Sequence, residues 1–321
     1  MIIIYGPTAS GKTDFADQLA QYLPSEIINM DMGQCYQPLA IGTAKPEWKT
    51  KPVAHHGFDI ITEPVNYTVA QYRSFIQQKI EEIIAKGKVP ILVGGSGFYL
   101  KSLLFPPVEL PSVEPTEQEY PEPEKRWDLL NAIDPERAAQ LHPHDVYRVT
   151  RALDIWYQTG KKPSTLAPLF NPVQSFLLLN LTRDRLDLNS RINARTHLMI
   201  EQGWIQEVQS LMNTSWQSFL QDKKIIGYDD IITYLSSSHS SKSWLISEIQ
   251  KKTRHYAKRQ LVFAAGLERE VRKALLGSSC TSDWLTLNLT LQPFELYIKQ
   301  VLNHPHLIMK SAKNECATKR A

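Results

Sequence analysis

The sequence has few cysteines and no long apolar run. Only three cysteines occur among its 321 residues, Cys35, Cys280 and Cys316, and they lie far apart. No CxxC pair indicates a zinc site and no cysteine framework indicates disulfides, so we expect a protein of the reducing cytoplasm. The apolar runs fall well short of the roughly 18 residues that a membrane-spanning helix needs, so we expect no membrane contact.

A strong excess of one charge is missing as well. Lys and Arg number 36 against 33 Asp and Glu, which gives a net charge of +3. This mild basicity is compatible with nucleic-acid binding but is not evidence for it. Local clusters of Lys and Arg are the more informative signal. The hydrophobic fraction of 42% is ordinary for a globular protein with a sizeable core. The length suits one large domain or two modest ones.

Short apolar runs alternate with helical patterns in the first half of the chain. Helical spacing of apolar residues follows Thr13 and recurs from Val69 to Ile83. Strands that alternate with helices predict an α/β fold with a parallel sheet. The predicted strands are Ile2–Tyr5, Ile27–Met30, Val89–Val93 and Phe176–Leu181, with Phe58–Ile61 as a weaker candidate.

A polar segment interrupts this pattern. Residues 106–123 hold six prolines and five glutamates, which is typical of a linker rather than a core element. We therefore predict a discontinuous catalytic core of residues 1–105 and 176–275, a helical insertion of residues 106–175, and a C-terminal extension of residues 276–321 that is disordered after residue 303. Helical patterns cover Trp127–Tyr157 in the insertion and then Leu186–Met212, Tyr228–Leu235 and Leu245–Leu267, with a loop at Ser236–Ser243.

The segment after the first predicted strand matches G-x-x-x-x-G-K-[ST], the phosphate-binding P-loop, at every fixed position. It reads Gly6, Pro7, Thr8, Ala9, Ser10, Gly11, Lys12 and Thr13, with a strand before it and an amphipathic helix after it. Backbone N–H groups and the helix N-terminus favour phosphate, Lys12 adds a full charge, and the Thr13 hydroxyl can hold Mg²⁺. The fold expected is a P-loop NTPase-like parallel sheet flanked by helices. The motif alone fits ATP, GTP or any other diphosphate.

Other polar residues follow the predicted strands and should reach the same edge of the sheet. Asp31 suits a general acid or base, although it could also cap a helix or lie in the outer shell of Mg²⁺. Ser96 stands in a glycine turn, and Arg183 and Arg185 follow the predicted strand Phe176–Leu181. Arg185, Arg191 and Arg195 are phosphate candidates or members of a solvated basic face. A second cluster, Lys251–Gln260, mixes cations with Tyr256 and suits RNA contact, though a plain surface helix would look similar.

Taken in order, the motifs resemble the tRNA dimethylallyltransferases, from Ile3 to about Gln260. The matching segments are the P-loop, Asp31–Tyr36 (D-S-x-Q-x-Y), Ile41–Pro46 (I-G-T-A-K-P), His55–Asp59, Val93–Tyr99 (V-G-G-T-G-L-Y), Asp134–Leu153, Arg185–Arg195, Ile226–Tyr228 and Tyr256–Gln260. Each later motif is short, but the ordered set is specific. Met32 departs from the serine of the family beside Asp31, and Leu261–Ala265 departs from its T-W-[FL]-R.

The resemblance implies transfer of a dimethylallyl group from dimethylallyl diphosphate to the adenosine 3′ to the anticodon of tRNA. The P-loop would hold the diphosphate with Mg²⁺ on Thr13, Asp31 would act as general base, and Lys12 and Ser96 would assist. The insertion would grip the anticodon stem-loop, and we expect a monomer. The implied tRNA contacts are Asp31, Met32, Gly33, Gln34, Tyr147, Arg148, Val149, Thr150, Arg151, Ile226, Gly227 and Tyr228.

Three alternatives remain open on the sequence. An adenylate isopentenyltransferase would share the P-loop and Asp31 but would have little use for an RNA-gripping insertion. A small-molecule kinase would place ATP in the cradle. A non-catalytic RNA-binding relative would tolerate the departures at Met32 and residues 261–265.

Overall fold

The computed structural model describes residues 1–107, 122–166, 168–237, 241–276 and 281–305. The chain forms two compact units, one of residues 1–103 and 173–321 and the other of residues 104–172. Most of the predicted Pro/Glu linker and the end of the predicted tail lie outside the described residues.

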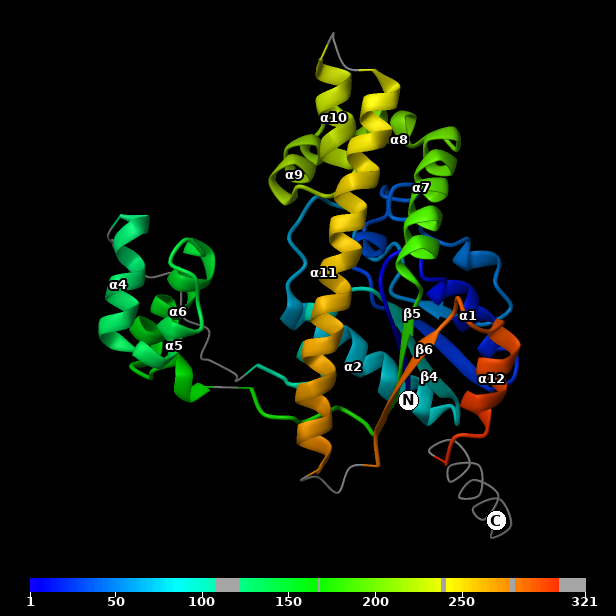
Figure 1. Ribbon diagram of the computed structural model, residues 1–321, viewed down its shortest axis with the longest axis horizontal. Coiled ribbons are helices and arrows are strands. Elements are labelled where there is room, and N and C mark those ends of the chain that lie inside the picture. Colours follow the sequence, from blue (N-terminus) through cyan, green and yellow to red (C-terminus); the bar gives the residue numbers. More distant parts are fainter. Residues whose placement is uncertain (108–121, 167, 238–240, 277–280, 306–321) are drawn as a thin grey trace. The chain divides into compact units, whose positions relative to one another are not determined.

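Six strands of the described residues form one parallel sheet in the larger unit, in the order β3-β2-β4-β1-β5-β6 (Figure 1). The central strand β1 pairs with β4 on one side and β5 on the other. This confirms the predicted α/β fold with a parallel sheet. The strands are β1 Ile2–Tyr5, β2 Ser25–Asn29, β3 His55–His56, β4 Val89–Gly94, β5 Leu177–Thr182 and β6 Asp283–Asn288.

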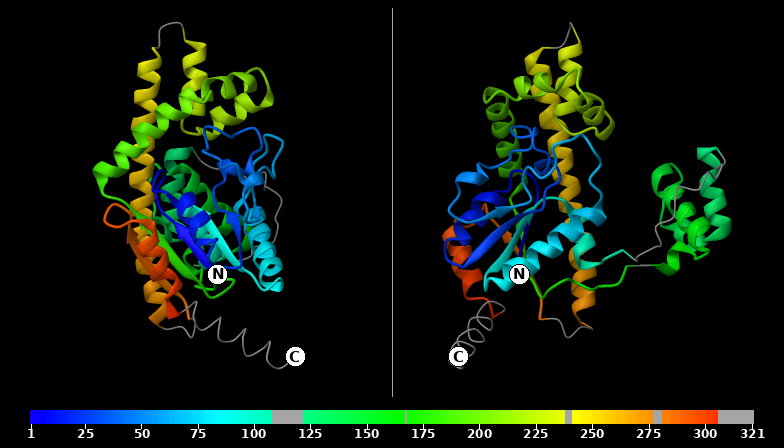
Figure 2. Two further views of the ribbon diagram at one scale, coloured as in Figure 1. Left: turned by 90° about the vertical axis from the view of Figure 1, so that its right-hand side faces the viewer. Right: turned by 180° about the vertical axis from the view of Figure 1, so that it is seen from behind.

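Helices flank this sheet and extend beyond it, and α11 is the longest of those described, running beside α7 (Figures 1 and 2). In the larger unit they are α1 Lys12–Leu19, α2 Val69–Ala85, α3 Gly97–Leu104, α7 Arg185–Glu201, α8 Trp204–Leu211, α9 Ser215–Lys223, α10 Tyr228–Ser236, α11 Lys242–Leu276 and α12 Phe294–Leu302, with the short 3-10 turns η1 Gly33–Cys35 and η2 Trp48–Thr50.

The core explains why the strand sequences are nearly continuous runs of Ile and Leu. Alternate residues such as Ile2, Ile4 and Leu179 pack against Phe15 of α1 and Ile298 of α12. Their neighbours point to the opposite face of the sheet and are equally buried. A parallel sheet covered on both faces buries nearly every position of its inner strands β1, β2, β4 and β5, and this buried frame fixes the strand ends that carry the site.

The structure corrects several predicted elements. Phe58–Ile61 is not a strand, because the edge strand is His55–His56 and Ile61 forms only an isolated bridge with Tyr36. The predicted helix Leu186–Met212 is two helices, since Gly203 adopts φ 101° and ends the first. Strand β6 and helix α12 were not predicted from the sequence, although residues 281–305 complete the sheet and its cover.

The smaller unit contains three described α-helices and the 3-10 turn η3, Pro163–Leu166, where the sequence suggested one long helical stretch. They are α4 Pro123–Ile133, α5 Pro135–Ala139 and α6 Val146–Thr159. Proline at the start of α4 and α5 and the Asp145 side chain at the start of α6 set these boundaries. Val149 and Leu153 lie in the apolar cluster between the helices.

Candidate active site

The P-loop joins β1 to α1, as the motif predicts, and its tight turn depends on two glycines. Gly11 adopts φ 100°, and a Cβ on Gly6 would come within 2.3 Å of the Leu181 carbonyl oxygen. The Lys12 side chain folds back over the loop and donates to the Pro7 carbonyl oxygen at 2.8 Å. The loop therefore already has the shape of a phosphate cradle, and the Lys12 ammonium group lies across it.

A small cavity of about 90 Å³ opens in front of this cradle. Lys12, Thr13, Asp31 and Arg195 line it, so it brings together the predicted phosphate, metal and acid–base groups. Burial lowers the pKa of Lys12 to about 8, although Asp31 opposes the shift. The cavity thus presents positive charge that an anionic ligand would stabilise.

Asp31 lies directly after β2, and its backbone is held by the preceding strand. Its N–H donates to the Asn29 Oδ1 atom at 2.9 Å, and its own Oδ1 accepts from the Gly33 N–H at 3.0 Å. Burial raises the pKa of the Asp31 carboxyl, against the opposing effects of Lys12 and Arg195. A carboxyl with a raised pKa accepts a proton more readily than an exposed one.

A larger cavity of about 370 Å³ adjoins the first. Its lining is largely apolar, with Met32, Ile226 and Trp204 on its walls and Arg259 among its few cations. Five residues line both cavities: Thr8, Asp31, Thr43, Arg195 and Tyr256. Asp31 therefore borders both the cavity beside the P-loop and the larger cavity.

The predicted arginines differ in where they lie. Arg195 lines both cavities, and Arg191 Nε donates to the P-loop carbonyl oxygen of Ala9 at 2.9 Å. Arg185 is exposed and lines neither cavity, so the structure does not place it with the phosphate candidates. Arg183, which follows the same strand, does reach the loop, where its Nε donates to the Ser10 carbonyl oxygen at 2.8 Å. Arg185 is displaced because it begins α7 on the solvent side.

Ser96 lines the larger cavity and not the smaller one. Gln260 of α11, which sequence reasoning did not assign to the site, lines the smaller cavity. Its Oε1 accepts from the Thr8 N–H and its Nε2 donates to the Gly95 carbonyl oxygen, both at 2.8 Å. Gln260 thereby joins the P-loop to the glycine turn. Its place at the end of the Lys251–Gln260 cluster was the available signal.

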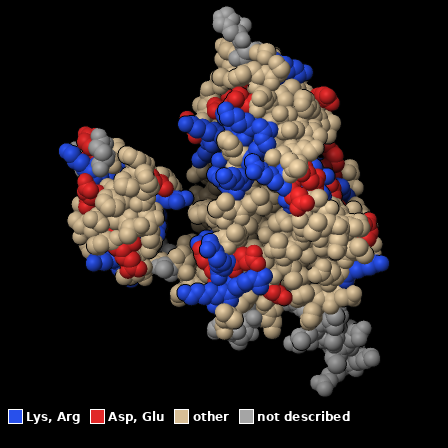
Figure 3. Space-filling view, viewed as in Figure 1, with Lys and Arg blue, Asp and Glu red and all other residues tan. Residues whose placement is uncertain are grey.

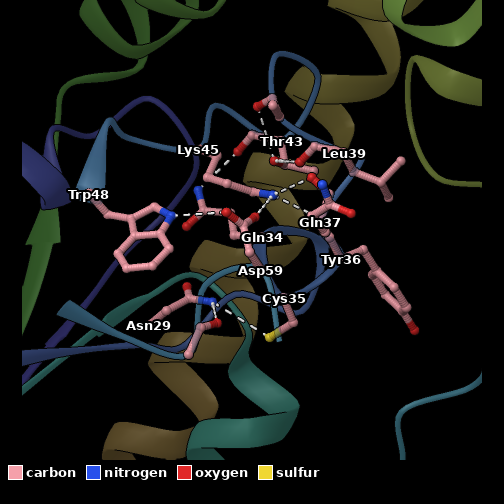
Figure 4. Close-up of polar contacts among 12 residues, drawn as sticks. Asn29, Gln34, Cys35, Tyr36, Gln37, Leu39, Thr43, Lys45, Trp48 and Asp59 are labelled. Atoms are coloured by element: carbon pink, nitrogen blue, oxygen red, sulfur yellow. Dashed lines mark hydrogen bonds and ion pairs between the residues drawn. The ribbon is translucent and has the colours of Figure 1, made fainter. Parts of the chain in front are cut away.

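The segment after Asp31 is fixed by polar contacts, which Figure 4 shows around Lys45 and Asp59. Gln34 Nε2 donates to the backbone oxygens of Thr43 and Ala44, at 3.0 and 3.2 Å. Lys45 also donates to the Tyr36 carbonyl oxygen at 2.7 Å. The residues matching I-G-T-A-K-P thus form a wall of the site.

The predicted RNA contacts separate into exposed and buried residues. Gly33 and Ile226 line the larger cavity, with Gln34 on the smaller one. Tyr228 is fully buried and Gly227 lies under Trp204, so neither presents a side chain to RNA. In the smaller unit Tyr147, Arg148 and Arg151 are exposed, Val149 is buried, and Thr150 accepts a hydrogen bond from Arg126 Nη1 at 2.9 Å.

Basic side chains gather along the upper part of α11 (Figure 3). Lys251, Lys252, Lys258 and Arg259 are all exposed there. Lys252 is paired with the buried Asp230, whereas Arg259 lies over the Tyr256 ring and lines the larger cavity. This basic surface therefore borders the larger cavity.

No helix among the described residues is long and apolar enough to cross a membrane.

Comparison with known proteins agrees with this geometry. The model of the IPP transferase family matches residues 34–269. The tRNA dimethylallyltransferase of Thermotoga maritima is 36% identical over 81% of this chain and 88% of its own length. That of Fervidobacterium nodosum is 39% identical over 82% of this chain and 86% of its own.

Two solved structures share the fold. A eukaryotic dimethylallyltransferase acting on tRNA has a TM-score of 0.75 at 27% identity, over 100% of this chain and 80% of its own. The tRNA isopentenylpyrophosphate transferase of Bacillus halodurans has a TM-score of 0.61 at 29% identity, over 98% of both chains. The family resemblance seen in the sequence motifs is confirmed, and the chain belongs to the IPP transferase family, among the tRNA dimethylallyltransferases.

Proposed function

We propose that this chain transfers the dimethylallyl group of dimethylallyl diphosphate to the exocyclic amine of the adenosine 3′ to the anticodon in tRNA. The observation that carries the proposal is the pair of cavities that adjoin at Asp31. One has the charges and the P-loop that a diphosphate needs. The other has the size and apolar walls that suit a nucleobase removed from its stack.

The diphosphate belongs in the small cavity because its negative charge matches Lys12, Arg195 and the N-terminus of α1. As the bond to the prenyl group breaks, charge grows on the departing oxygen. Groups that are already in place stabilise that charge without having to reorganise. Arg183 and Arg191 hold the loop by its carbonyl oxygens and keep the cradle in shape.

The adenosine belongs in the larger cavity, where Tyr256 and Ile226 offer ring and apolar surface and Arg259 offers a cation for the RNA backbone. In the reaction the amine nitrogen attacks C1 of the prenyl group, the C1–O bond breaks, and diphosphate leaves with the bonding electrons. Asp31 accepts the proton that the amine loses. Its raised pKa favours this transfer.

Mg²⁺ fits the small cavity through the Thr13 hydroxyl. The described residues contain no cluster of three or more His, Cys, Asp and Glu that could hold a metal ion. A Mg²⁺ ion that takes few protein ligands and completes its shell from phosphate oxygens and water matches this donor set. It would neutralise charge on the leaving diphosphate.

The smaller unit suits contact with the anticodon stem-loop, because Tyr147, Arg148 and Arg151 are exposed on α6. An aromatic ring beside two guanidinium groups can stack on bases and contact phosphates. A tRNA substrate agrees with a cytoplasmic protein, and we expect it to act as a monomer.

The proposal is tested by offering the protein dimethylallyl diphosphate, Mg²⁺ and one acceptor at a time. With unmodified tRNA we expect one adenosine to gain a C5 group, detected by mass spectrometry of the nucleosides. Product with AMP and none with tRNA would make the chain an adenylate isopentenyltransferase. Saturable ATP binding with no prenyl transfer to either acceptor would instead favour a kinase.

A further inference from the structure

One loop contributes to the walls of both cavities without being part of the P-loop. It spans residues 39–45, and we name it the wall loop. Thr43 lines both cavities and Gly42 lines the larger one. A Cβ placed on Gly33 would come within 2.9 Å of Thr43 Cγ2, so the loop lies directly against the turn that follows Asp31. The position of this loop therefore sets the shape of the site beside the proposed base.

Glu207 of α8 binds the backbone of the wall loop. Its Oε2 accepts from the N–H groups of Ala40 and Ile41 at 3.0 and 2.6 Å, and its Oε1 accepts from the Gly42 N–H at 3.2 Å. Three successive N–H groups thus converge on one carboxylate. Hydrogen bonds to an ionised acceptor are about twice as strong as neutral ones.

Two aromatic residues complete the contact. The Tyr228 hydroxyl donates to Glu207 Oε1 at 2.6 Å. Burial and the neighbouring Glu207 raise the pKa of Tyr228, so its hydroxyl stays protonated and remains a donor. The Trp204 ring covers Gly42 so closely that a Cβ there would lie 2.1 Å from the indole Nε1 atom. The wall loop is consequently held by hydrogen bonds to the Glu207 carboxylate and by close packing of the Trp204 ring on Gly42.

We infer that Glu207 is a positioning residue, which fixes the wall loop so that the cavities meet at Asp31 in a reactive geometry. The inference rests on the proposed function and deepens it. Glu207 lines neither cavity. It acts through Thr43 and through Gln34, whose side chain donates to the wall-loop oxygens.

The chemistry requires a carboxylate at this position. Its two oxygens accept four hydrogen bonds here, three from the loop and one from Tyr228. A glutamine has one oxygen and an NH₂ group, so Glu207→Gln sets a donor against at least one donor of the loop. The substitution preserves size and removes only the charge and one acceptor.

The test compares Glu207→Gln with a matched change, Glu82→Gln. Glu82 is a carboxylate of α2 that pairs with Lys79 at 2.7 Å and lines neither cavity. For Glu207→Gln we expect faster amide hydrogen exchange at residues 40–42. We also expect kcat with tRNA to fall at least tenfold while the affinity for inorganic diphosphate stays within threefold. Glu82→Gln should change none of these, and Tyr228→Phe should give a smaller loss in kcat.

Unchanged exchange at residues 40–42 in Glu207→Gln would overturn the inference. So would a lower thermal midpoint with unchanged kcat, because a purely structural role predicts that result. If the wild-type protein prenylates no tRNA, the proposed function fails, yet hydrogen exchange still decides whether Glu207 holds the loop.

Discussion

Lys12 and Asp31 line the same small cavity. Burial lowers the pKa of Lys12 and raises the pKa of Asp31, so it favours the neutral form of each side chain. The two shifts have opposite signs because the buried forms that lose hydration are a cation and an anion. A bound diphosphate would favour the charged form of Lys12. Ligand binding and protonation of Lys12 are therefore coupled.

This coupling predicts a pH dependence of diphosphate binding. The pKa of Lys12 is lowered to about 8, so the free protein loses this charge as the pH rises through that value. We expect the affinity for dimethylallyl diphosphate to be highest below pH 8 and to fall by up to about tenfold per pH unit above it, since one proton is involved. Isothermal titration between pH 6.5 and 9.5 measures this dependence.

The control is Lys12→Arg, whose guanidinium does not titrate in this range. It should remove the pH dependence that Lys12 causes while leaving that of the ligand itself, which is common to both proteins. Identical pH profiles for the two proteins would show that Lys12 does not titrate near 8.

At the scale of elements, the helical part of the larger unit meets the wall loop through closely packed glycines. Gly227 precedes the first residue of α10 and has φ 86°, and a Cβ there would lie 2.0 Å from the Trp204 ring. Gly227 and Tyr228 of the motif Ile226–Tyr228 are therefore packed within the larger unit. Only Ile226 of the three lines the larger cavity.

We predict that Gly227→Ala destabilises the protein by about 3 kcal/mol, because it adds left-handed backbone strain to a steric clash with Trp204. The matched control is Gly87→Ala. Gly87 also has a positive φ, 72°, but has nothing within 4 Å of an added Cβ, so strain alone should cost about 1 kcal/mol. Urea unfolding of both variants gives the difference, and equal losses would contradict the packing argument.

Local patterns explain which parts were predictable from the sequence. The P-loop and Asp31 were identified because a contiguous motif or a strand end places them. Glu207 and Gln260 were not, because the backbone groups that they bind lie more than 160 residues away and only the fold brings them together. Arg183 and Arg185 differ by two positions, and the start of α7 decides which one reaches the P-loop. β6 was missed because Asp283–Asn288 mixes polar and apolar residues, whereas the predicted strands are nearly continuous apolar runs.

At the scale of the whole molecule, the smaller unit is a compact insertion whose ends meet. The Asn171 N–H donates to the Leu104 carbonyl oxygen at 2.9 Å, and Phe105 and Phe170 are in ring contact. Arg148 and Arg151 are exposed on this unit, and each has an i,i+3 carboxylate near it. Exposed ion pairs of this kind are weak, so both charges are available to RNA phosphates.

We predict that the double variant Arg148→Ala, Arg151→Ala weakens tRNA binding and lowers the slope of log affinity against log salt by about 2, one unit for each lost phosphate contact. Filter binding across a salt series measures both. Arg137→Ala is the control, because Arg137 is hydrogen-bonded to Gln140 at the end of α5. An unchanged slope in the double variant would remove these arginines from the RNA-binding surface.

The central claim is that Asp31 lies between two substrates that bind on different sides of it. Asp31→Asn keeps the size of the side chain and removes the base. The most direct test measures binding of dimethylallyl diphosphate and tRNA to this variant, together with single-turnover prenyl transfer. We predict that both ligands bind at once, each within about threefold of its wild-type affinity, while transfer slows by about 10² to 10⁴. Mutually exclusive binding, or transfer at the wild-type rate, would contradict the account.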